Sequence, residues 1–315
     1  MGYDTIMNFP SLFVNYLQPE KLHQINVSFV VDRLEKQLGG IATNIAYNLS
    51  LVTKKKIKVY GAVGRDGGRL LRFLKKRGVD TANIIIDRRV YTASGLVITD
   101  QKDNQIWGYY YGASHRAKDI EPRPEEGKNG LMIISATHLA AFIHFQKAAI
   151  KKKIRYLYDP GMVLTTIKPN DLIEGVDHCS WLVGNDYEMA MIFKKINKKP
   201  HQLLKDKAVI TTLGENGVCY QDKKNHYHVG GYRLEKVIDP TGAGDAWRAG
   251  FVGGIIDGKS IVECLKQGNA LASFVIESYG TVNHRPTSDQ INKRIKKLKL
   301  LKNHELRHQK HLPCL

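Results

Sequence analysis

The stretch of chain best suited to chemistry runs from residue 237 to residue 256 and reads VIDPTGAGDAWRAGFVGGII. The end of an apolar strand leads into a glycine turn at 241–245 and then into an apolar helix rich in small residues. Gly242 and Gly244 can adopt backbone angles closed to other residues, so successive N–H groups can converge on one point, where the helix N-terminus adds its dipole. The turn is therefore a candidate anion site.

Asp245 stands directly at this candidate anion site, where its carboxylate would repel the anion. Its presence is explained if it accepts a proton from a hydroxyl that attacks a phosphoryl group held by the N–H groups. In the simpler alternative, Thr241 or Asp245 only caps a helix that follows a glycine turn. Taken by itself, the stretch leaves both interpretations open.

Short β-branched or aromatic runs alternate with amphipathic segments along most of the chain, which predicts a parallel sheet covered by helices on both faces. The expected strands are 57–63, 131–137, 154–159, 179–185 and 207–213. The expected helices are 41–52, 68–77, 138–152, 186–195, 243–257, 260–278 and 288–302. The fold class that follows is α/β.

Two segments, 22–37 and 89–112, interrupt this alternation because each reads as strands without an intervening helix. We expect them to form a small antiparallel lid over a crevice. The chain is thus predicted to be one domain, 1–315, with lid segments at about 8–37 and 89–112 and a basic C-terminal helix or tail at about 286–315.

Composition places the chain among ordinary globular proteins with one unusual property, its charge. Of its 315 residues 43% are hydrophobic, and 48 Lys and Arg residues against 30 Asp and Glu residues give a formal net charge of +18. Such an excess favours anionic partners. Four widely spaced cysteines suggest no disulfide framework, and the longest apolar stretch, 131–145, is too short to cross a bilayer. We expect a cytoplasmic protein with no membrane association.

Residues 239–251, DPTGAGDAWRAGF, resemble the C-terminal signature of the ribokinase or PfkB family of carbohydrate and nucleoside kinases. The resemblance implies a ribokinase-like three-layer α/β/α fold with a small β lid. It assigns Asp245 the role of catalytic base, and Gly242, Ala243 and Gly244 the role of the anion hole.

Further motifs follow in the order found in that family. Gly39, Gly40 and Asn44 resemble its N-terminal Gly-Gly-x-x-x-Asn segment, which contacts sugar hydroxyls, although a plain Gly-Gly turn before a helix is the simpler alternative. Asp4 resembles the substrate-binding Asp of relatives, but only three residues precede it where relatives have an apolar strand. Either the start is misplaced, or the sheet lacks a member and Asp4 lies on a frayed terminus.

The nucleotide side of the site is implied by a second group of motifs. Asn185 and Glu188 resemble the Asn-x-x-Glu that organises Mg²⁺ through water, but the same spacing is a helix-capping pair. Residues 212–217 resemble a nucleotide-binding Thr-x-Gly-x-x-Gly segment, although Asn216-Gly217 also suits a hairpin turn. The resemblance implies these nucleotide and cation ligands: Thr212, Gly214, Gly217 and Asn269 for ATP, and Asp239 and Thr241 for a monovalent cation such as K⁺.

These motifs predict an ATP- and Mg²⁺-dependent kinase that phosphorylates a hydroxymethyl group of a ribonucleoside, adenosine first, or of a sugar as in ribokinase and fructokinase. The preference for a nucleoside rests on segments 159–161, 185–188 and 280–285, which resemble adenosine-kinase-like members. The aromatic residues at 107 and 109–111 could stack on a base. A homodimer formed through the lid is also possible in this interpretation.

Two rival functions stay open at this level. Residues 253–260 match a P-loop pattern, but Ile255 and Ile256 suit a helix better than a phosphate-wrapping loop, with Gly258 as its terminator. The net charge could instead mark a nucleic-acid-binding protein without kinase activity, although no recognised binding motif accompanies it. We therefore expect a small-molecule kinase for which nucleic acid is an improbable partner.

Overall fold

The computed structural model describes residues 1–17, 24, 26–102, 104–123, 130–204 and 206–301. The part of the predicted C-terminal tail beyond residue 301, and lid residues 18–23 and 25, lie outside the described residues. None of the helices in the described ranges has both the length and the apolar character needed to cross a lipid bilayer.

A seven-stranded sheet forms the centre of the molecule, in the order β13-β12-β11-β10-β9-β8-β7. Strands β7 to β10 are parallel, and β11, β12 and β13 extend the sheet in antiparallel pairs. The strand bounds are β7 (Leu131–Ser135), β8 (Arg155–Asp159), β9 (Trp181–Asn185), β10 (Ala208–Thr212), β11 (Val218–Gln221), β12 (His226–Val229) and β13 (Leu300–Leu301). The parallel strands are apolar because both of their faces are covered.

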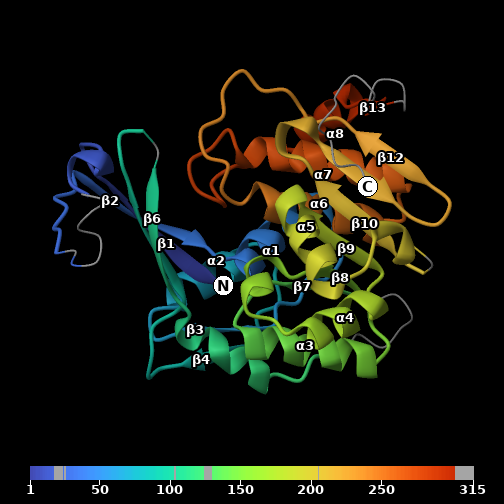
Figure 1. Ribbon diagram of the computed structural model, residues 1–315, viewed down its shortest axis with the longest axis horizontal. Helices are drawn as coiled ribbons and strands as arrows, with labels where there is room; N and C mark the ends of the chain where they lie inside the picture. Colours follow the sequence, from blue (N-terminus) through green and yellow to red (C-terminus); the bar gives the residue numbers. More distant parts are fainter. Residues whose placement is uncertain (18–23, 25, 103, 124–129, 205, 302–315) are drawn as a thin grey trace.

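Helices cover each face of this sheet, so the architecture is three-layered (Figure 1). On one face lie α3 (Leu139–Lys151), α4 (Pro169–His178) and α5 (Asp186–Ile196), which pack on Tyr158 and Leu182. On the other lie α1 (Ile41–Val52), α6 (Ala243–Ile256), α7 (Ile261–Val275) and α8 (Ser288–Lys297), where α1, α6 and α7 pack on Leu157, Val183 and Ile210. The predicted α/β fold class is confirmed.

A separate four-stranded sheet, in the order β2-β1-β5-β6, stands to the left of the main body in Figure 1. It consists of β1 (Gly2–Asn8), β2 (Arg33–Gly39), β5 (Ser94–Thr99) and β6 (Gln105–Tyr110). Strand β1 is antiparallel to β2 and parallel to β5, and β5 and β6 form a hairpin. The prediction of an antiparallel lid is therefore wrong in part, because β1 joins the two predicted segments and pairs with β5 in parallel. We refer to these four strands as the lid sheet.

The amino-terminal region differs from the expectation in two respects. Asp4 lies within β1, paired on one side with Gln37 and on the other with Gly95, so the alternative that placed it on a frayed terminus is wrong. The predicted strand 57–63 is shorter, as β3 (Gly61–Gly64), and pairs only with β4 (Ile84–Asp87). Because no described strand hydrogen-bonds both β3 and β7, the two-stranded sheet is separate from the central one.

The carboxyl-terminal region corrects a further prediction. Helix α8 ends at Lys297, not at 302, because Leu298 leaves the helix and Leu300–Leu301 pair with β12. Ile291 and Leu298 are buried against α7 and the sheet, as their apolar character requires. Helix α2 (Gly68–Lys76) buries Leu70 and Leu74 in a smaller core with Tyr47 of α1.

Candidate active site

The glycine turn predicted before α6 is present, and its shape depends on glycine. Gly242 is the N-cap of α6 with a φ of +82°, and a Cβ at this position would lie 2.9 Å from Thr281 Cγ2. The carboxylate of Asp239 fixes the residues that precede the turn, because it accepts hydrogen bonds from Thr241 N at 2.9 Å and Gly280 N at 3.0 Å. Ala243, Gly244 and Asp245 follow in the first turn of the helix, whose free N–H groups suit an anion.

Asp245 is held from across the molecule by Asn44. Asn44 Nδ2 donates a hydrogen bond of 2.8 Å to Asp245 Oδ2, so the segments containing the two predicted motifs meet at one carboxylate. Burial raises the pKa of Asp245 to about 6, although Arg248 and the hydrogen bond from Asn44 oppose the increase. A carboxylate with such a pKa is a good proton acceptor near neutral pH.

Asp4, Gly39 and Gly40 also lie together. A Cβ on Gly39 would lie 2.0 Å from Asp4 Oδ2, so any other residue at position 39 would have to displace this carboxylate. Gly40 has a φ of +81° and is the N-cap residue of α1, so the predicted Gly-Gly turn before a helix is correct. Asn44 is one of the buried residues at the beginning of this helix. Burial raises the pKa of Asp4 to about 6, partly offset by the N-terminal amino group. Two carboxylates, Asp4 and Asp245, thus lie at either end of the motif 39–44.

Asn185 and Glu188 form the capping box that the simpler interpretation predicts. Glu188 N donates to Asn185 Oδ1 at 2.8 Å, and Asn185 N donates to Glu188 Oε2 at 2.9 Å. Burial also raises the pKa of Glu188, with a smaller contribution from Asp159. Among the described residues no group of three or more His, Cys, Asp or Glu side chains could hold a metal ion. A Mg²⁺ ion here would need phosphate and water oxygens besides Glu188, which matches its usual coordination.

Thr212, Gly214 and Gly217 lie in the connection from β10 to β11. Thr212 ends β10, Gly214 begins a short 3₁₀ turn, and Gly217 has a φ of +90°. A Cβ on Gly217 would lie 2.1 Å from the carbonyl oxygen of Val229, so the turn packs tightly on the end of β12. The hairpin interpretation is correct geometrically, and the nucleotide role of the same residues stays a prediction.

The side chain of Asn269 makes three hydrogen bonds within the protein. Its Nδ2 donates to Val229 O at 3.1 Å and to Gly230 O at 2.9 Å, and its Oδ1 accepts from Trp247 Nε1 at 2.8 Å. Both hydrogens of Nδ2 are thereby used, so only the second lone pair of Oδ1 is left for a hydrogen bond with adenine. Asn269 instead fixes the strand end against which Gly217 packs.

Sequence reasoning missed two charged residues beside this site. Arg248 and Asp159 form a buried ion pair, with Arg248 Nη2 2.6 Å from Asp159 Oδ1 and side chains only 9% and 4% exposed. The sequence does show Arg248 as a cation among small and apolar residues of the predicted helix, one helical turn after the glycine turn, and this could have indicated a buried charge. Thr281 was noted only in a motif, yet its Oγ1 lies 2.8 Å from Asn44 Oδ1.

The P-loop interpretation of residues 253–260 is wrong. Gly253 and Gly254 lie within α6, where a Cβ would meet Val52 and Cys264 respectively, and Gly258 follows the helix end with a φ of +74°. Lys259 Nζ contacts Gln267 Oε1 of α7 instead of facing a phosphate-binding loop. The prediction that this segment is the end of a helix is confirmed.

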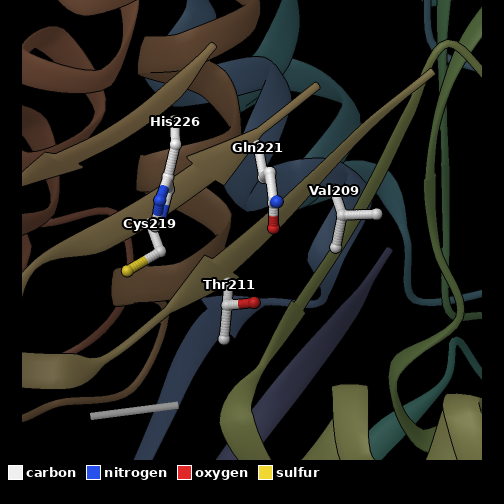
Figure 2. A pocket seen from close by; sticks show the side chains of 5 residues that line it. All are labelled: Val209, Thr211, Cys219, Gln221 and His226. Carbon is white, nitrogen blue, oxygen red and sulfur yellow. The ribbon is translucent and has the colours of Figure 1, made fainter. Parts of the chain in front are cut away.

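A small cavity on the central sheet is unrelated to these residues. Figure 2 shows its lining, namely Val209 and Thr211 of β10, Cys219 and Gln221 of β11, and His226 of β12. Its volume of about 10 Å³ suffices for a water molecule, whereas ligand pockets are typically several hundred Å³. It therefore takes no nucleoside or nucleotide.

Comparison with known proteins agrees with this geometry. The nucleoside kinase of Methanothermobacter thermautotrophicus is 30% identical over 276 residues, which cover 85% of this chain and 88% of that protein. The nucleoside kinase of Methanocaldococcus jannaschii is 28% identical over 282 residues, covering 88% of this chain and 92% of that protein. Its crystal structure, described as an archaeal member of the ribokinase family, superposes with a TM-score of 0.84 at 26% identity, covering 94% of this chain and 95% of that one.

A third relative is a bacterial enzyme solved with ligands. The structure of Burkholderia thailandensis nucleoside kinase in complex with ADP-inosine has a TM-score of 0.80 at 26% identity, covering 94% of this chain and 93% of that one. The sequence pattern of the pfkB family of carbohydrate kinases matches residues 12–288. With the glycine turn, its aspartate and the lid sheet in place, the chain belongs to the pfkB family of carbohydrate kinases and has the ribokinase-like fold.

Proposed function

We propose that this kinase transfers the γ-phosphoryl group of ATP to the hydroxymethyl group of a ribonucleoside. The observation that carries the proposal is the position of Asp245, in the first turn of α6 beside the turn at Gly242 and held by Asn44. A proton acceptor and a set of backbone donors for phosphate are thereby placed side by side.

In the proposed reaction the hydroxymethyl oxygen attacks the γ-phosphorus. Asp245 takes the proton of that hydroxyl, a P–O bond forms to the acceptor, and the bond from the γ-phosphorus to the β–γ bridging oxygen breaks, which releases ADP. The N–H groups of Gly242, Ala243 and Gly244 stabilise charge on the transferring group. Asp4, Gly39 and Gly40 bind the sugar hydroxyls, so that the hydroxymethyl group points at Asp245.

Mg²⁺ and ATP complete the proposed site. Glu188, with Asp159 beside it, would hold Mg²⁺ through water, and the ion supplies neutralisation of phosphate charge when bound. Thr212, Gly214 and Gly217 would contact ATP, with Asn269 holding the strand end behind them. Asp239 and Thr241 stay the proposed ligands of a monovalent cation.

The lid sheet supports a nucleoside as the acceptor. Gly95 pairs with Asp4 on one side and with Tyr109 on the other, so Tyr109 lies on the same face of the lid sheet as the carboxylate of Asp4. Tyr109 packs edge to face on Tyr111 at 4.9 Å, and Tyr111 packs in the same way on His138 at 5.4 Å. These half-exposed rings offer a base an apolar, stackable surface that a simple sugar would not need.

A sugar is the second candidate acceptor, because the family pattern is that of carbohydrate kinases. An ATP-consumption assay over adenosine, inosine, other nucleosides, ribose and fructose separates the two. We expect kcat/KM to be highest for a purine nucleoside and Asp245→Asn to abolish turnover. Lys259→Ala is expected to retain activity. Absence of acceptor-dependent turnover in a folded protein would contradict the proposal.

The outer face of the lid sheet supports a homodimer. Leu34, Met7, Ile98 and Ile106 form one cross-strand row on the face opposite Asp4, and Leu34 and Ile106 are 62% and 42% exposed. An apolar row of this kind is a candidate contact with a second copy. Light scattering should show a dimer that Ile106→Lys converts to a monomer, and a monomeric wild type would contradict this part of the proposal.

A further inference from the structure

Arg248 occupies a position that packing alone does not explain. It lies on the buried face of α6 among small and apolar neighbours, and its side chain is 9% exposed. Buried ion pairs contribute little net stability compared with apolar side chains of similar volume. A cation at this position therefore needs a reason in the site.

The guanidinium lies between the glycine turn and the carboxyl end of β8. Its Nη1 is 2.6 Å from where a Cβ on Gly244 would lie, so it packs directly against the backbone of the turn. Its Nη2 donates to Asp159 Oδ1 at 2.6 Å, at the carboxyl end of β8. Its Nε is buried and has no hydrogen-bond partner among the described residues.

Arg248 is ion-paired with Asp159 and is also within electrostatic range of two further carboxylates. Burial lowers the pKa of Arg248, but Asp159, Asp245 and Glu188 together raise it above its ordinary value. Asp245 belongs to the same helix, Asp159 ends β8, and Glu188 lies in the first turn of α5. The charge of Arg248 thus acts on both the proton acceptor and the side of the site proposed for Mg²⁺.

We infer that Arg248 is a positioning residue of the phosphoryl-transfer site, whose buried guanidinium holds Asp159 and packs on the glycine turn beside Asp245. The inference rests on the proposed function. It explains why Gly244 is glycine, since any side chain there would displace the guanidinium.

Loss of the charge should alter the titration of Asp245 in a defined direction. Asp245 is faced by Arg248 from its own helix, by Asn44 from α1, by Asp159 from β8 and by the amino group of Met1. Removal of Arg248 leaves Asp159 as an unbalanced like charge. The pKa of Asp245 should therefore increase beyond about 6.

The test compares Arg248→Met, which removes the charge, with Arg248→Lys, which keeps it. In Arg248→Met, kcat should fall about 10²-fold and the acid limb of its pH profile should move upward, with little change in the nucleoside KM. In Arg248→Lys, kcat should fall less and the acid limb should stay near its wild-type position. Arg294→Met is the matched control, because Arg294 is 14% exposed and ion-paired with Glu277 outside the site, and its kcat profile should not change.

Carbon-13 NMR of Asp245 in the ligand-free protein, assigned with Asp245→Asn, gives a reading that needs no turnover. A raised pKa of Asp245 in Arg248→Met supports the inference even if the protein phosphorylates none of the acceptors tested. Absence of phosphorylation would contradict only the proposed function. An unchanged pKa of Asp245 and an unchanged kcat in folded Arg248→Met would overturn the inference. If Arg248→Met does not fold, the same measurements are made on Arg248→Gln, which also removes the charge, and an unchanged pKa of Asp245 with an unchanged kcat would overturn the inference.

Discussion

Asn44 donates a 2.8 Å hydrogen bond to Asp245 although 201 residues separate them in the chain. The orientation of the Asn44 amide is set on its other side, where Thr281 Oγ1 lies 2.8 Å from Asn44 Oδ1. Three distant segments, the start of α1, the start of α6 and the loop after α7, therefore converge on one carboxylate. The position of the proposed base depends on tertiary structure as much as on its own glycine turn.

Asn44→Asp should disturb this arrangement more than Asn44→Ala. The new carboxylate would lie beside Asp245, and two adjacent carboxylates raise the pKa of one of them strongly. We expect the acid limb of the kcat profile to move upward by at least about one pH unit in Asn44→Asp. Asn44→Ala, which loses only the hydrogen bond, should shift it less. Superposable profiles for the two variants would argue against a direct Asn44–Asp245 interaction during turnover.

Turnover should decline in mild acid. Burial raises the pKa values of both Asp245 and Asp4 to about 6, and each must be ionised to act as base or as hydroxyl acceptor. Because protonation dominates below these pKa values, kcat should fall as the pH decreases through about 6. The nucleoside kcat/KM should fall more steeply, since it reports both groups. A profile flat down to pH 5, measured with saturating ATP, would contradict these ionisations.

Asp245→Asn should stabilise the protein while abolishing turnover. The pKa of Asp245 rises from 3.8 to about 6 on folding, so the folded state binds its proton more tightly than the unfolded state. The ionised carboxylate therefore destabilises the fold increasingly as the pH rises from about 4 to 6, and fully above that range. Asn, which can still accept from Asn44, should increase the free energy of unfolding by roughly 1–3 kcal/mol at pH 8. Chemical denaturation at pH 8 and pH 4 should show this gain only at pH 8.

Local patterns predicted the starts of several helices because those helices carry their own boundary signals, whereas the end of α8 was set by the pairing of 300–301 with β12. Helix α1 follows Gly40, and the capping box of Asn185 and Glu188 begins α5 where the sequence places it. The pairing of β3 with β4, apart from the central sheet, depends on which strands lie next to each other in space. No local spacing encodes that choice.

The contacts between side chains that are distant in the sequence could not be predicted from local sequence patterns either. The charge of Arg248 resembles those of the many surface cations, and only its burial against Asp159 distinguishes it. Asn269 lies at a position that the motif predicts to be near adenine, yet its side-chain amide forms hydrogen bonds with Trp247 and with the end of β12. The glycine turn at 241–245 was predictable because the positive φ that it requires is met by a glycine within the motif itself.

Gly217→Ala tests whether the turn between β10 and β11 serves the nucleotide. Gly217 has a φ of +90°, and its Cβ would lie 2.1 Å from Val229 O, the same oxygen that accepts a hydrogen bond from Asn269 Nδ2. The end of β12 must shift to accommodate a methyl group, so the variant combines backbone strain with displacement of that strand end. We expect the KM for ATP to increase about tenfold or more, equivalent to roughly 1.4 kcal/mol, with a smaller change in the nucleoside KM.

Gly258→Ala is the matched control for this prediction. Gly258 also has a positive φ, +74°, but apart from its neighbours in the chain no described heavy atom lies within 4 Å of where its Cβ would stand. It follows the end of α6. It should lose about 1 kcal/mol of stability from backbone strain alone and keep the wild-type KM for ATP. Since both variants carry strain at a positive φ, a selective increase in the ATP KM of Gly217→Ala isolates the contact with β12. Equal ATP KM values in the two variants would place the nucleotide elsewhere on the sheet edge.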